Sequence, residues 1–396
     1  MSDANGPAST PDADAGEGTD AGAQADADAA PPMDNGAPSS TFPAPHAPAR
    51  ALVKLPGPVL AHPTVIPVFF GDDKDRARTE SVLASLVGSD YWKNLAEYGV
   101  GDIAVGASVV LADKAPATFS LDGIDSVVEG LWLRDVAPAP KPDGTQIYAL
   151  FFPVQTQVVQ VDGSPFCDAG GAYHDSRAMD FAYAITPHCS PSFNEYMLSA
   201  THELIEAATD PYPLTNPASA GADAAHVGYR GEVGDLCDYG GSRGGGGFPL
   251  FGTTVERIFS NVRAKAGHDP CVPDLGLTYF GAAPEAKDDI QVSDFVLGAV
   301  KGKGVVVKAG ASAMVTLDLY SERQLAPFKV VADTMDPGTN QPSANIQVSL
   351  DRDHGQNGEK LHLTITRTHK NAGGDLVFIR AVSARELWTD FIFVGD

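Results

Sequence analysis

The sequence predicts an α+β chain in which a mixed α/β domain is followed by an all-β sandwich and preceded by a disordered acidic tail. The first fifty residues contain no Leu, Ile or Val and have Arg50 as their only Lys or Arg. Strand-like and helix-like apolar patterns then alternate up to about Asp210, and short β-rich runs follow from about Asp288. We therefore expect a tail over 1–51, a mixed domain over 52–284 and an immunoglobulin-like sandwich over 285–396.

The tail is rich in Ala, Asp, Gly and Pro, which is why we expect it to be disordered. Such a segment cannot bury enough apolar surface to offset the entropy that is lost when a backbone is ordered. An acidic, Pro-containing chain of this kind suits a tether. The rest of the 396-residue chain is long enough to form two or three domains with their own cores.

In the mixed domain, each element is predicted from its apolar spacing and from the residues that end it. A buried strand ends at Gly71, a helix stops at Gly88, and a longer helix is ended by Asp210-Pro211 because proline cannot continue it. The expected strands cover Val65–Phe70, Ile103–Leu111, Ser126–Leu133, Gln146–Phe152 and Phe181–Ile185, and the expected helices include Val82–Val87, Tyr91–Tyr98 and Ser192–Thr209.

The segment after Asp210 changes character, because Gly and Pro are frequent up to about Phe251. We expect it to form loops, and its Gly244–Gly247 run, which lacks the Lys and Ser/Thr of a phosphate-binding loop, to form a flexible rim. The sandwich strands are then expected at Val305–Val307, Met314–Leu319, Phe328–Val331, Ile346–Leu350, Leu361–Thr366, Leu376–Ile379 and Phe391–Val394.

Charge and hydropathy exclude several classes of partner. The formal net charge of -24 argues against nucleic acid or an anionic membrane surface, because phosphate binding needs clustered Lys and Arg. No stretch is long and apolar enough to be a transmembrane segment. The start, Met1-Ser2-Asp3, lacks the regions of a signal peptide, so either the protein stays inside the cell or its export signal has been removed.

The cysteines favour a secreted or cell-surface protein. There are four of them, and none has the Cys-x-x-Cys spacing of a zinc ribbon, so two disulfides are expected. Of the three possible pairings we favour Cys167–Cys189 with Cys237–Cys271, because each bridge then closes a local segment.

The helix motif His202-Glu203-Leu204-Ile205-Glu206 is the strongest chemical signal in the chain. Residues four apart lie on one helix face, so His202 and Glu206 can bind one cation. Glu203 would lie beside the open position of the metal. In His-Glu-x-x-His metalloproteases that glutamate polarises the attacking water, and zinc lowers the pKa of its water to about 7. The motif therefore predicts a zincin-like Zn²⁺ site with Glu203 as the catalytic base.

Glu206 stands where the common motif has a second His, and a third ligand must come from another segment. A carboxylate leaves the metal less positive, which weakens water activation and makes harder cations such as Ca²⁺ more competitive. Glu232 and Asp235 are the best candidates for the third ligand, because a disulfide at Cys237 would anchor their segment. Glu232 resembles the downstream ligand of gluzincins, whereas Asp235 could ligate or could orient His202.

Other candidate ligands are weaker. His174 lies near Cys167 and could be a further ligand, although we favour a structural or surface role for it. Asp210 is best explained as a helix stop, but with Asp238 it could bind a second cation such as calcium.

Several segments resemble the exordium, or phosphate-induced protein 1, family of secreted plant proteins and its bacterial relatives. The closest matches are His202–Pro211 and Glu232–Cys237, the latter followed by a run of glycines. Phe166-Cys167 with Ala172-Tyr173-His174 is similar to the family's Cys-Gly-Tyr-His stretch. The resemblance covers about Val65–Cys271 and implies an extracellular location and a retained His-Glu-x-x-Glu motif. It does not extend to the tail or to the sandwich.

Three functions follow from these patterns. The first is a secreted metal-dependent hydrolase, a zinc metallopeptidase acting on a peptide or on a cell-surface or cell-wall substrate. The second is a non-catalytic secreted or cell-surface binding protein with a structural metal site. The third is a toxin-like cargo protein that is exported without a signal peptide. Nothing in the sequence predicts the oligomeric state.

Overall fold

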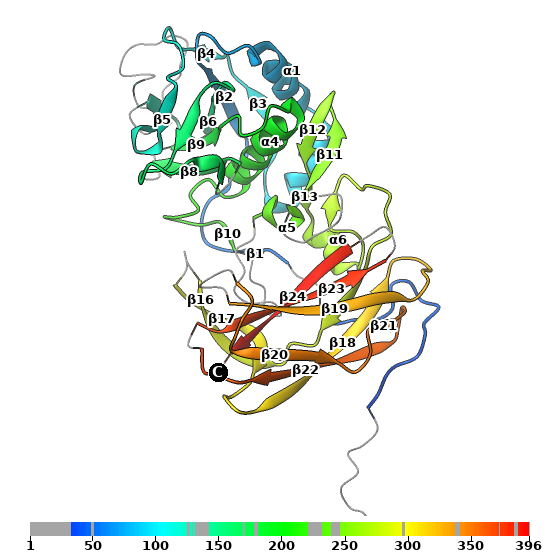
Figure 1. Ribbon diagram of the computed structural model, residues 1–396. Coiled ribbons are helices and arrows are strands. Elements are labelled where there is room, and N and C mark those ends of the chain that lie inside the picture. Colours follow the sequence, from blue (N-terminus) through cyan, green and yellow to red (C-terminus); the bar gives the residue numbers. More distant parts are fainter. Residues whose placement is uncertain are drawn as a thin grey trace, which may run out of the picture. The chain divides into compact units, whose positions relative to one another are not determined.

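A computed structural model describes residues 33–48, 51–124, 127–128, 130, 142–168, 171–177, 181–220, 232–238, 246–294, 298–336, 341–371, 373–383 and 387–395. Met1–Asp34 and Asn35–Asp396 form two separate units. The larger unit contains a mixed α/β region and a β-rich region, as the sequence predicts (Figure 1).

The α/β region is built on one central sheet with the strand order β3-β2-β6-β9-β8, in which β4 also pairs with β2. All pairings are parallel except that of the edge strand β8, which runs antiparallel to β9. The central strands have almost no exposed residue, as expected of parallel strands covered on both faces. The strands are β2 (Thr64–Phe69), β3 (Ala104–Val105), β4 (Val109–Val110), β6 (Gln146–Phe151), β8 (Tyr173–Arg177) and β9 (Phe181–Thr186).

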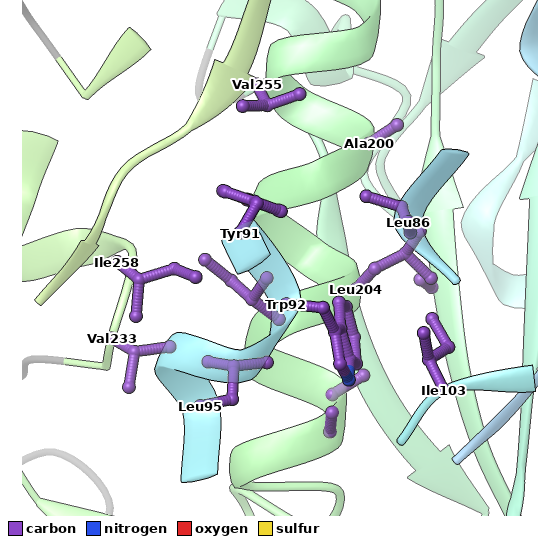
Figure 2. Packing of buried hydrophobic residues seen from close by; sticks show 14 of the residues in the cluster. Leu86, Tyr91, Trp92, Leu95, Ile103, Ala200, Leu204, Val233, Val255 and Ile258 are labelled. Atoms are coloured by element: carbon purple, nitrogen blue, oxygen red, sulfur yellow. The ribbon is translucent and has the colours of Figure 1, made fainter. Parts of the chain in front are cut away.

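Helices cover one face of this sheet, and α4 lies along it against β6, β8 and β9 (Figure 1). Figure 2 shows Ala200 and Leu204 of α4 within the apolar cluster that also contains Leu86, Tyr91 and Trp92. The other face carries a second apolar cluster that includes Ile66, Tyr148 and Ile185. The helices on the face that α4 covers are α1 (Arg76–Leu86), α2 (Asp90–Lys93), the 3-10 helix η1 (Asn94–Tyr98) and α4 itself (Phe193–Thr209).

The long helix α4 confirms the element predicted over Ser192–Thr209. The Ser192 hydroxyl caps its first turn by accepting a hydrogen bond from the Glu195 N–H, and the helix ends at Asp210, before Pro211. The strand expected over Ser126–Leu133 is wrong for its described residues, because Val127, Val128 and Gly130 are helical, and the rest of that range falls outside the described residues. Ile124 and Val128, four residues apart, are both buried, which is helical rather than strand periodicity.

Short elements complete this region. The 3-10 helices are η2 (Leu121–Gly123) and η3 (Phe166–Asp168), and the short helices are α5 (Asp235–Asp238) and α6 (Asn261–Lys265). The paired strands are β1 (Val53–Lys54) with β10 (Ser219–Ala220), β5 (Thr118–Ser120) with β7 (Gln157–Val159), β11 (Gly247–Leu250) with β12 (Thr253–Glu256), and β13 (Ile258–Phe259) with β14 (Cys271–Val272).

The hairpin of β11 and β12 corrects the expectation that only loops extend to Phe251. Phe251 and Gly252 both have positive φ values, 53° and 74°, as a type I′ turn requires. Gly247, expected in a flexible rim, lies in β11, whereas Gly244 and Gly245 fall outside the described residues. The hairpin matters for the site because it positions Glu256.

Both predicted disulfides are present. Cys167 pairs with Cys189 and Cys237 pairs with Cys271, at sequence separations of 22 and 34 residues. The second bridge ties α5 to β14 and therefore anchors the segment that carries Glu232 and Asp235. In the described part of the chain, no helix is long and apolar enough to cross a membrane.

The β-rich region consists of two sheets whose facing sides share one apolar core, with Leu317, Leu363 and Ile379 among its buried residues. One sheet has the order β15-β18-β22-β20 and the other β16-β17-β24-β23-β19-β21. The strands are β15 (Phe280–Pro284), β16 (Asp288–Asp294), β17 (Gly298–Val306), β18 (Ser312–Ser321), β19 (Phe328–Met335), β20 (Ile346–Leu350), β21 (His354–Gly355), β22 (Lys360–Arg367), β23 (Asp375–Val382) and β24 (Leu387–Gly395).

The order β15-β18-β22-β20 matches strands A, B, E and D of an immunoglobulin sandwich, and β24-β23-β19 matches strands G, F and C of its facing sheet, to which β16, β17 and β21 are added. The four cysteines all precede this region, so it lacks the disulfide between sheets that antibody domains have. A buried ion pair between Arg367 and Asp375 (2.9 Å) lies within it instead. Three strands were missed from the sequence, β15, β16 and β21, and β15 begins at Phe280, before the boundary expected at residue 285.

The expectation of disorder over the whole tail is wrong for its last part. Backbone groups of Asn35 and Ser39 pair with those of Lys360 and Asn357 at 2.8 Å, and the Asn357 side chain accepts a hydrogen bond from the Ala44 N–H at 2.9 Å. Hydrogen bonds therefore order this segment although it offers few apolar side chains. Residues 1–32, 49 and 50, which complete the predicted tail, fall outside the described residues.

Candidate metal site

A cluster of histidines and carboxylates lies where α4 passes the edge strand β8 and the segment that leads into α5. The helix contributes His202, Glu203 and Glu206, and β8 contributes His174. Glu206 is 2% exposed, Glu203 5% and His174 8%, so most of the ionisable groups of the cluster are removed from solvent. Buried charges need partners, which makes their contacts informative.

Glu206 is the central residue of the cluster. Its Oε1 accepts hydrogen bonds from the backbone N–H groups of Gly234 (3.2 Å) and Asp235 (3.1 Å). Its Oε2 lies 3.1 Å from His202 Nε2 and 3.7 Å from His174 Nδ1. One carboxylate oxygen is therefore held by the backbone, while the other faces two imidazoles.

Gly234 allows this approach of the backbone to the helix. A Cβ atom on it would lie 2.7 Å from His202 Nδ1 and 3.0 Å from Glu206 Oε1, closer than packed atoms can come. Only glycine fits between the two side chains without displacing them. The backbone of the Glu232–Cys237 segment can therefore approach α4 this closely because residue 234 has no side chain.

His202 is held from both sides of its ring. Its Nε2 lies 3.6 Å from Asp235 Oδ1, and its Nδ1 lies 3.5 Å from Oε2 of Glu256 on β12. Glu256 is fully buried, and its backbone accepts a hydrogen bond from the Tyr91 hydroxyl (2.7 Å). Glu256 was missed in the sequence because it stands alone in a short strand. The carboxylate orients His202 in the way that acidic partners orient metal-binding histidines.

His174 is buried within the cluster, so of the two roles favoured for it from the sequence, structural or surface, the surface role is wrong. Its Nδ1 lies 3.1 Å from Glu203 Oε2, and its Nε2 lies 3.4 Å from Glu232 Oε1 and 3.1 Å from the Asp210 carbonyl oxygen. The residue reaches the cluster because β8 is the strand next to β9, under the C-terminal half of α4. The signals in the sequence were the proximity of His174 to Cys167 and the resemblance of Ala172-Tyr173-His174 to the family stretch.

The electrostatics of the cluster reflect an excess of negative charge. Burial raises the pKa of Glu206 well above its ordinary value. Burial lowers the pKa of His174 and His202, but the neighbouring carboxylates outweigh this effect and raise both pKa values well above the ordinary range. Burial, with a contribution from the Glu232 charge, raises the pKa of Asp210 to about 7. The site therefore retains protons that free side chains would release.

Burial also raises the pKa of Glu232, but the charges of the two histidines outweigh it and lower the pKa overall. Among the described residues, the ion-pair partners of Glu203, Glu206 and Glu232 are His174 and His202. No donor in the described part of the chain completes a hydrogen bond with Glu232 Oε1, which is buried. A cation would satisfy this atom and offset the excess negative charge.

The residues present fit a metal ion. Ligand atoms of His174, Glu206 and Glu232 all lie within 4.8 Å of one another, and so do those of His202, Glu203 and Glu206. Contacts of 3.1–3.7 Å between these nitrogens and oxygens compare with edges of about 3.3–3.5 Å in a tetrahedral zinc site. The structure thus brings together every residue proposed from the sequence as a zinc ligand or base.

The proposed calcium pair is a separate question. Asp210 is 2% exposed, and its Oδ1 accepts a hydrogen bond from the Ala218 N–H at 2.8 Å. The side chain of Asp238 falls outside the described residues. Asp210 is thus tied to its own loop and serves as the helix stop that the sequence predicted.

Comparison of the chain with protein-family models and with curated proteins finds no match. Among solved structures, part of the chain is similar to a crystal structure of the complex of titin M10 with obscurin-like 1 Ig. The sequence identity is 21% and the TM-score 0.16, over 23% of this chain and 82% of that chain. The immunoglobulin assignment depends on the strand order, to which this match adds no argument.

Proposed function

We propose that the chain is a secreted, zinc-dependent hydrolase with a zincin-like site, and that it acts on peptide bonds. One observation carries the proposal: His174 from β8, His202 and Glu206 from α4, and Glu232 and Asp235 from a distant segment meet in one largely buried cluster. Side chains of this kind are the usual ligands of zinc, and a buried excess of carboxylates is stable only with a cation or with retained protons.

Each residue would have a distinct task. His202, Glu206 and Asp235 would hold the zinc ion, with Glu256 keeping the His202 ring in place. Zinc supplies Lewis acidity and lowers the pKa of a water molecule at the site. Glu203 Oε2 would take up the proton of that water, and His174 Nδ1, at 3.1 Å, would hold this carboxylate in position.

Substrate would approach from the Glu232–Asp235 side. The side chains of Asp235, Glu232 and His202 are 25%, 23% and 14% exposed, whereas those of His174 and Glu203 are 3% and 7% exposed. A reacting group must reach the metal from solvent. The more exposed ligands therefore mark the open side of the site.

Two further features support export and a surface-associated substrate. Two disulfides suit an oxidising, extracellular environment. The resemblance of the motif segments to the exordium family implies the same location. The immunoglobulin-like sandwich would serve as the module that binds a cell-surface or cell-wall partner, because such sandwiches present loops at both ends.

The burial of Glu203 favours a second candidate function, a non-catalytic secreted binding protein with a structural metal. Its side chain is 7% exposed and its Oε2 is engaged by His174. In that case the metal would tie α4 to the Glu232–Cys237 segment and stabilise both. Removal of the metal would then lower the melting temperature without the loss of any activity.

The test is metal analysis of the purified protein under chelator-free conditions, combined with peptide hydrolysis. The wild type should contain zinc, His202→Ala should lose the zinc ion that His202 binds, and Glu203→Gln should retain zinc but lose hydrolysis of a peptide library. Glu195→Gln, an exposed glutamate of the same helix, is the matched control and should behave as the wild type. Zinc-free wild-type protein would refute the proposal, and zinc-loaded protein without hydrolysis would favour the structural role.

A further inference from the structure

The two histidines of the site approach Glu206 separately, and each brings its own second carboxylate. His202 Nε2 lies near Asp235 Oδ1 (3.6 Å), whereas His174 Nε2 lies near Glu232 Oε1 (3.4 Å). The sequence offered Glu232 and Asp235 as rivals for one ligand position. In the structure they are not rivals, because each is the neighbour of a different histidine.

Glu206 belongs to both sets. Its Oε1 is engaged by two backbone N–H groups, so Oε2 alone faces the imidazoles, at 3.1 Å from His202 and 3.7 Å from His174. The two histidines also fall in different compact ligand groups, which share Glu206. A carboxylate oxygen between two ligand sets is the arrangement of a bridging ligand.

We infer that the site binds two divalent metal ions, bridged by Glu206, with His202 and Asp235 on one ion and His174 and Glu232 on the other. This inference deepens the proposed function and depends on it, since it adds a second ion to the same cluster. In enzymes that use two metals, the ions lie about 3.5–4 Å apart and together stabilise the attacking and leaving oxygens.

The charge of the cluster favours two ions over one. Glu203, Glu206, Glu232, Asp235 and the fully buried Glu256 carry five negative charges when ionised, and histidines that bind metal are neutral. One divalent ion would leave three negative charges uncompensated in a largely buried site. Two divalent ions would leave only one.

Each histidine also has an outer partner that keeps its ring in place. Glu256 Oε2 lies 3.5 Å from His202 Nδ1, and Glu203 Oε2 lies 3.1 Å from His174 Nδ1. Metal-binding histidines usually have such a carboxylate or carbonyl behind the ring. The Nε2 atom of each ring then faces its own ligand carboxylate, Asp235 for His202 and Glu232 for His174. Both imidazole rings are thus held in an orientation in which they can bind a metal ion.

The experiment is zinc stoichiometry of the full chain, measured by mass spectrometry after equilibration in a zinc buffer. We expect two zinc ions per wild-type chain, and one per chain in both His174→Ala and His202→Ala. Glu232→Gln should also bind one, which provides a milder variant should a histidine substitution impair folding. His354→Ala, an exposed histidine of the sandwich, is the control and should bind two.

An independent readout is the electron paramagnetic resonance spectrum of the protein loaded with Mn²⁺. Two ions that share a carboxylate should give a spin-coupled spectrum, and His174→Ala should convert it to that of an isolated ion. One zinc per wild-type chain would overturn the inference and leave the proposed function intact, whereas zinc-free protein would overturn both. Two zinc ions in folded His174→Ala would refute the assignment of the second ion to His174.

Discussion

Replacement of Gly234 by alanine tests whether the geometry of the site, rather than its composition alone, creates the metal affinity. The substitution changes no ligand and no charge. Its Cβ would lie 2.7 Å from His202 Nδ1, 2.9 Å from His202 Cε1 and 3.0 Å from Glu206 Oε1, so the segment or the two side chains must move.

The magnitude follows from two effects. Overpacking of a buried position costs about 1–3 kcal/mol. A shift of the segment also weakens the two hydrogen bonds to Glu206 Oε1, and a hydrogen bond to a charged group contributes about 1.5–3 kcal/mol. If the loss of one such bond is added to the overpacking, binding should weaken by roughly 2.5–6 kcal/mol, or about 60-fold to 20,000-fold in Kd.

The assay is competition for zinc against a chromophoric chelator, with urea unfolding of the metal-free protein measured in parallel. Gly123→Ala is the matched control, because a Cβ atom added at that position would point into open space. Gly123→Ala should bind zinc as the wild type does. If Gly234→Ala also binds zinc with unchanged affinity, the close approach of this backbone to Glu206 has no role in the site and the reasoning fails.

Three further predictions concern single residues. Glu256→Ala should lower zinc affinity about 10- to 100-fold in the same competition assay, because His202 loses the carboxylate that orients its ring. Asp375→Ala should destabilise the sandwich by about 3–5 kcal/mol in urea unfolding, because it leaves the buried Arg367 charge without its carboxylate. Burial raises the pKa of Asp351, but hydrogen bonds from His362 outweigh it and lower the pKa below 3.8. That stabilisation is complete above the unfolded pKa and is lost as pH falls through the folded one, so Asp351→Asn should be less stable than the wild type at pH 7, and the difference should shrink as the pH is lowered through the folded pKa of Asp351.

Local patterns explain why α4 and its motif could be predicted. The helix carries a capping Ser192, an apolar stripe and a proline stop, and the four-residue spacing of His202 and Glu206 follows from helix geometry alone. The segment of Glu232 and Asp235 could be placed at the same site through the disulfide of Cys237. Each inference needed information from only a few neighbouring residues.

The other half of the site depends on contacts between distant segments. His174 reaches Glu206 because β8 pairs with β9 and α4 packs across both, and nothing near His174 in the sequence indicates that pairing. Glu256 reaches His202 because the turn at Phe251 folds β12 back over the helix. Positions of this kind are determined by topology, which single-sequence periodicity does not contain.

The errors in the fold have similar causes. The Ser126–Leu133 segment contains a β-branched run that favours a strand, but the burial of Ile124 and Val128 imposes helical periodicity. The last part of the tail is ordered by hydrogen bonds to Asn357, a turn residue more than three hundred positions away. Composition describes the ability of a segment to form a core, and it does not report backbone groups that pair with a distant loop.

The disulfide between Cys237 and Cys271 makes the geometry of the site depend on the oxidation state of these two cysteines. The segment that carries Glu232 and Asp235 ends at this bridge, and Gly234, without a side chain, provides no anchor of its own. In a chain whose thiols are reduced, the two histidines and Glu206 would still stand on α4 and β8, but the segment of the backbone donors to Glu206 would lose its covalent bridge and keep only the packing of Val233 and Leu236 and the hydrogen bond from the Phe259 N–H. We therefore expect the chain to bind its metal after the Cys237–Cys271 disulfide has formed, which requires an oxidising environment.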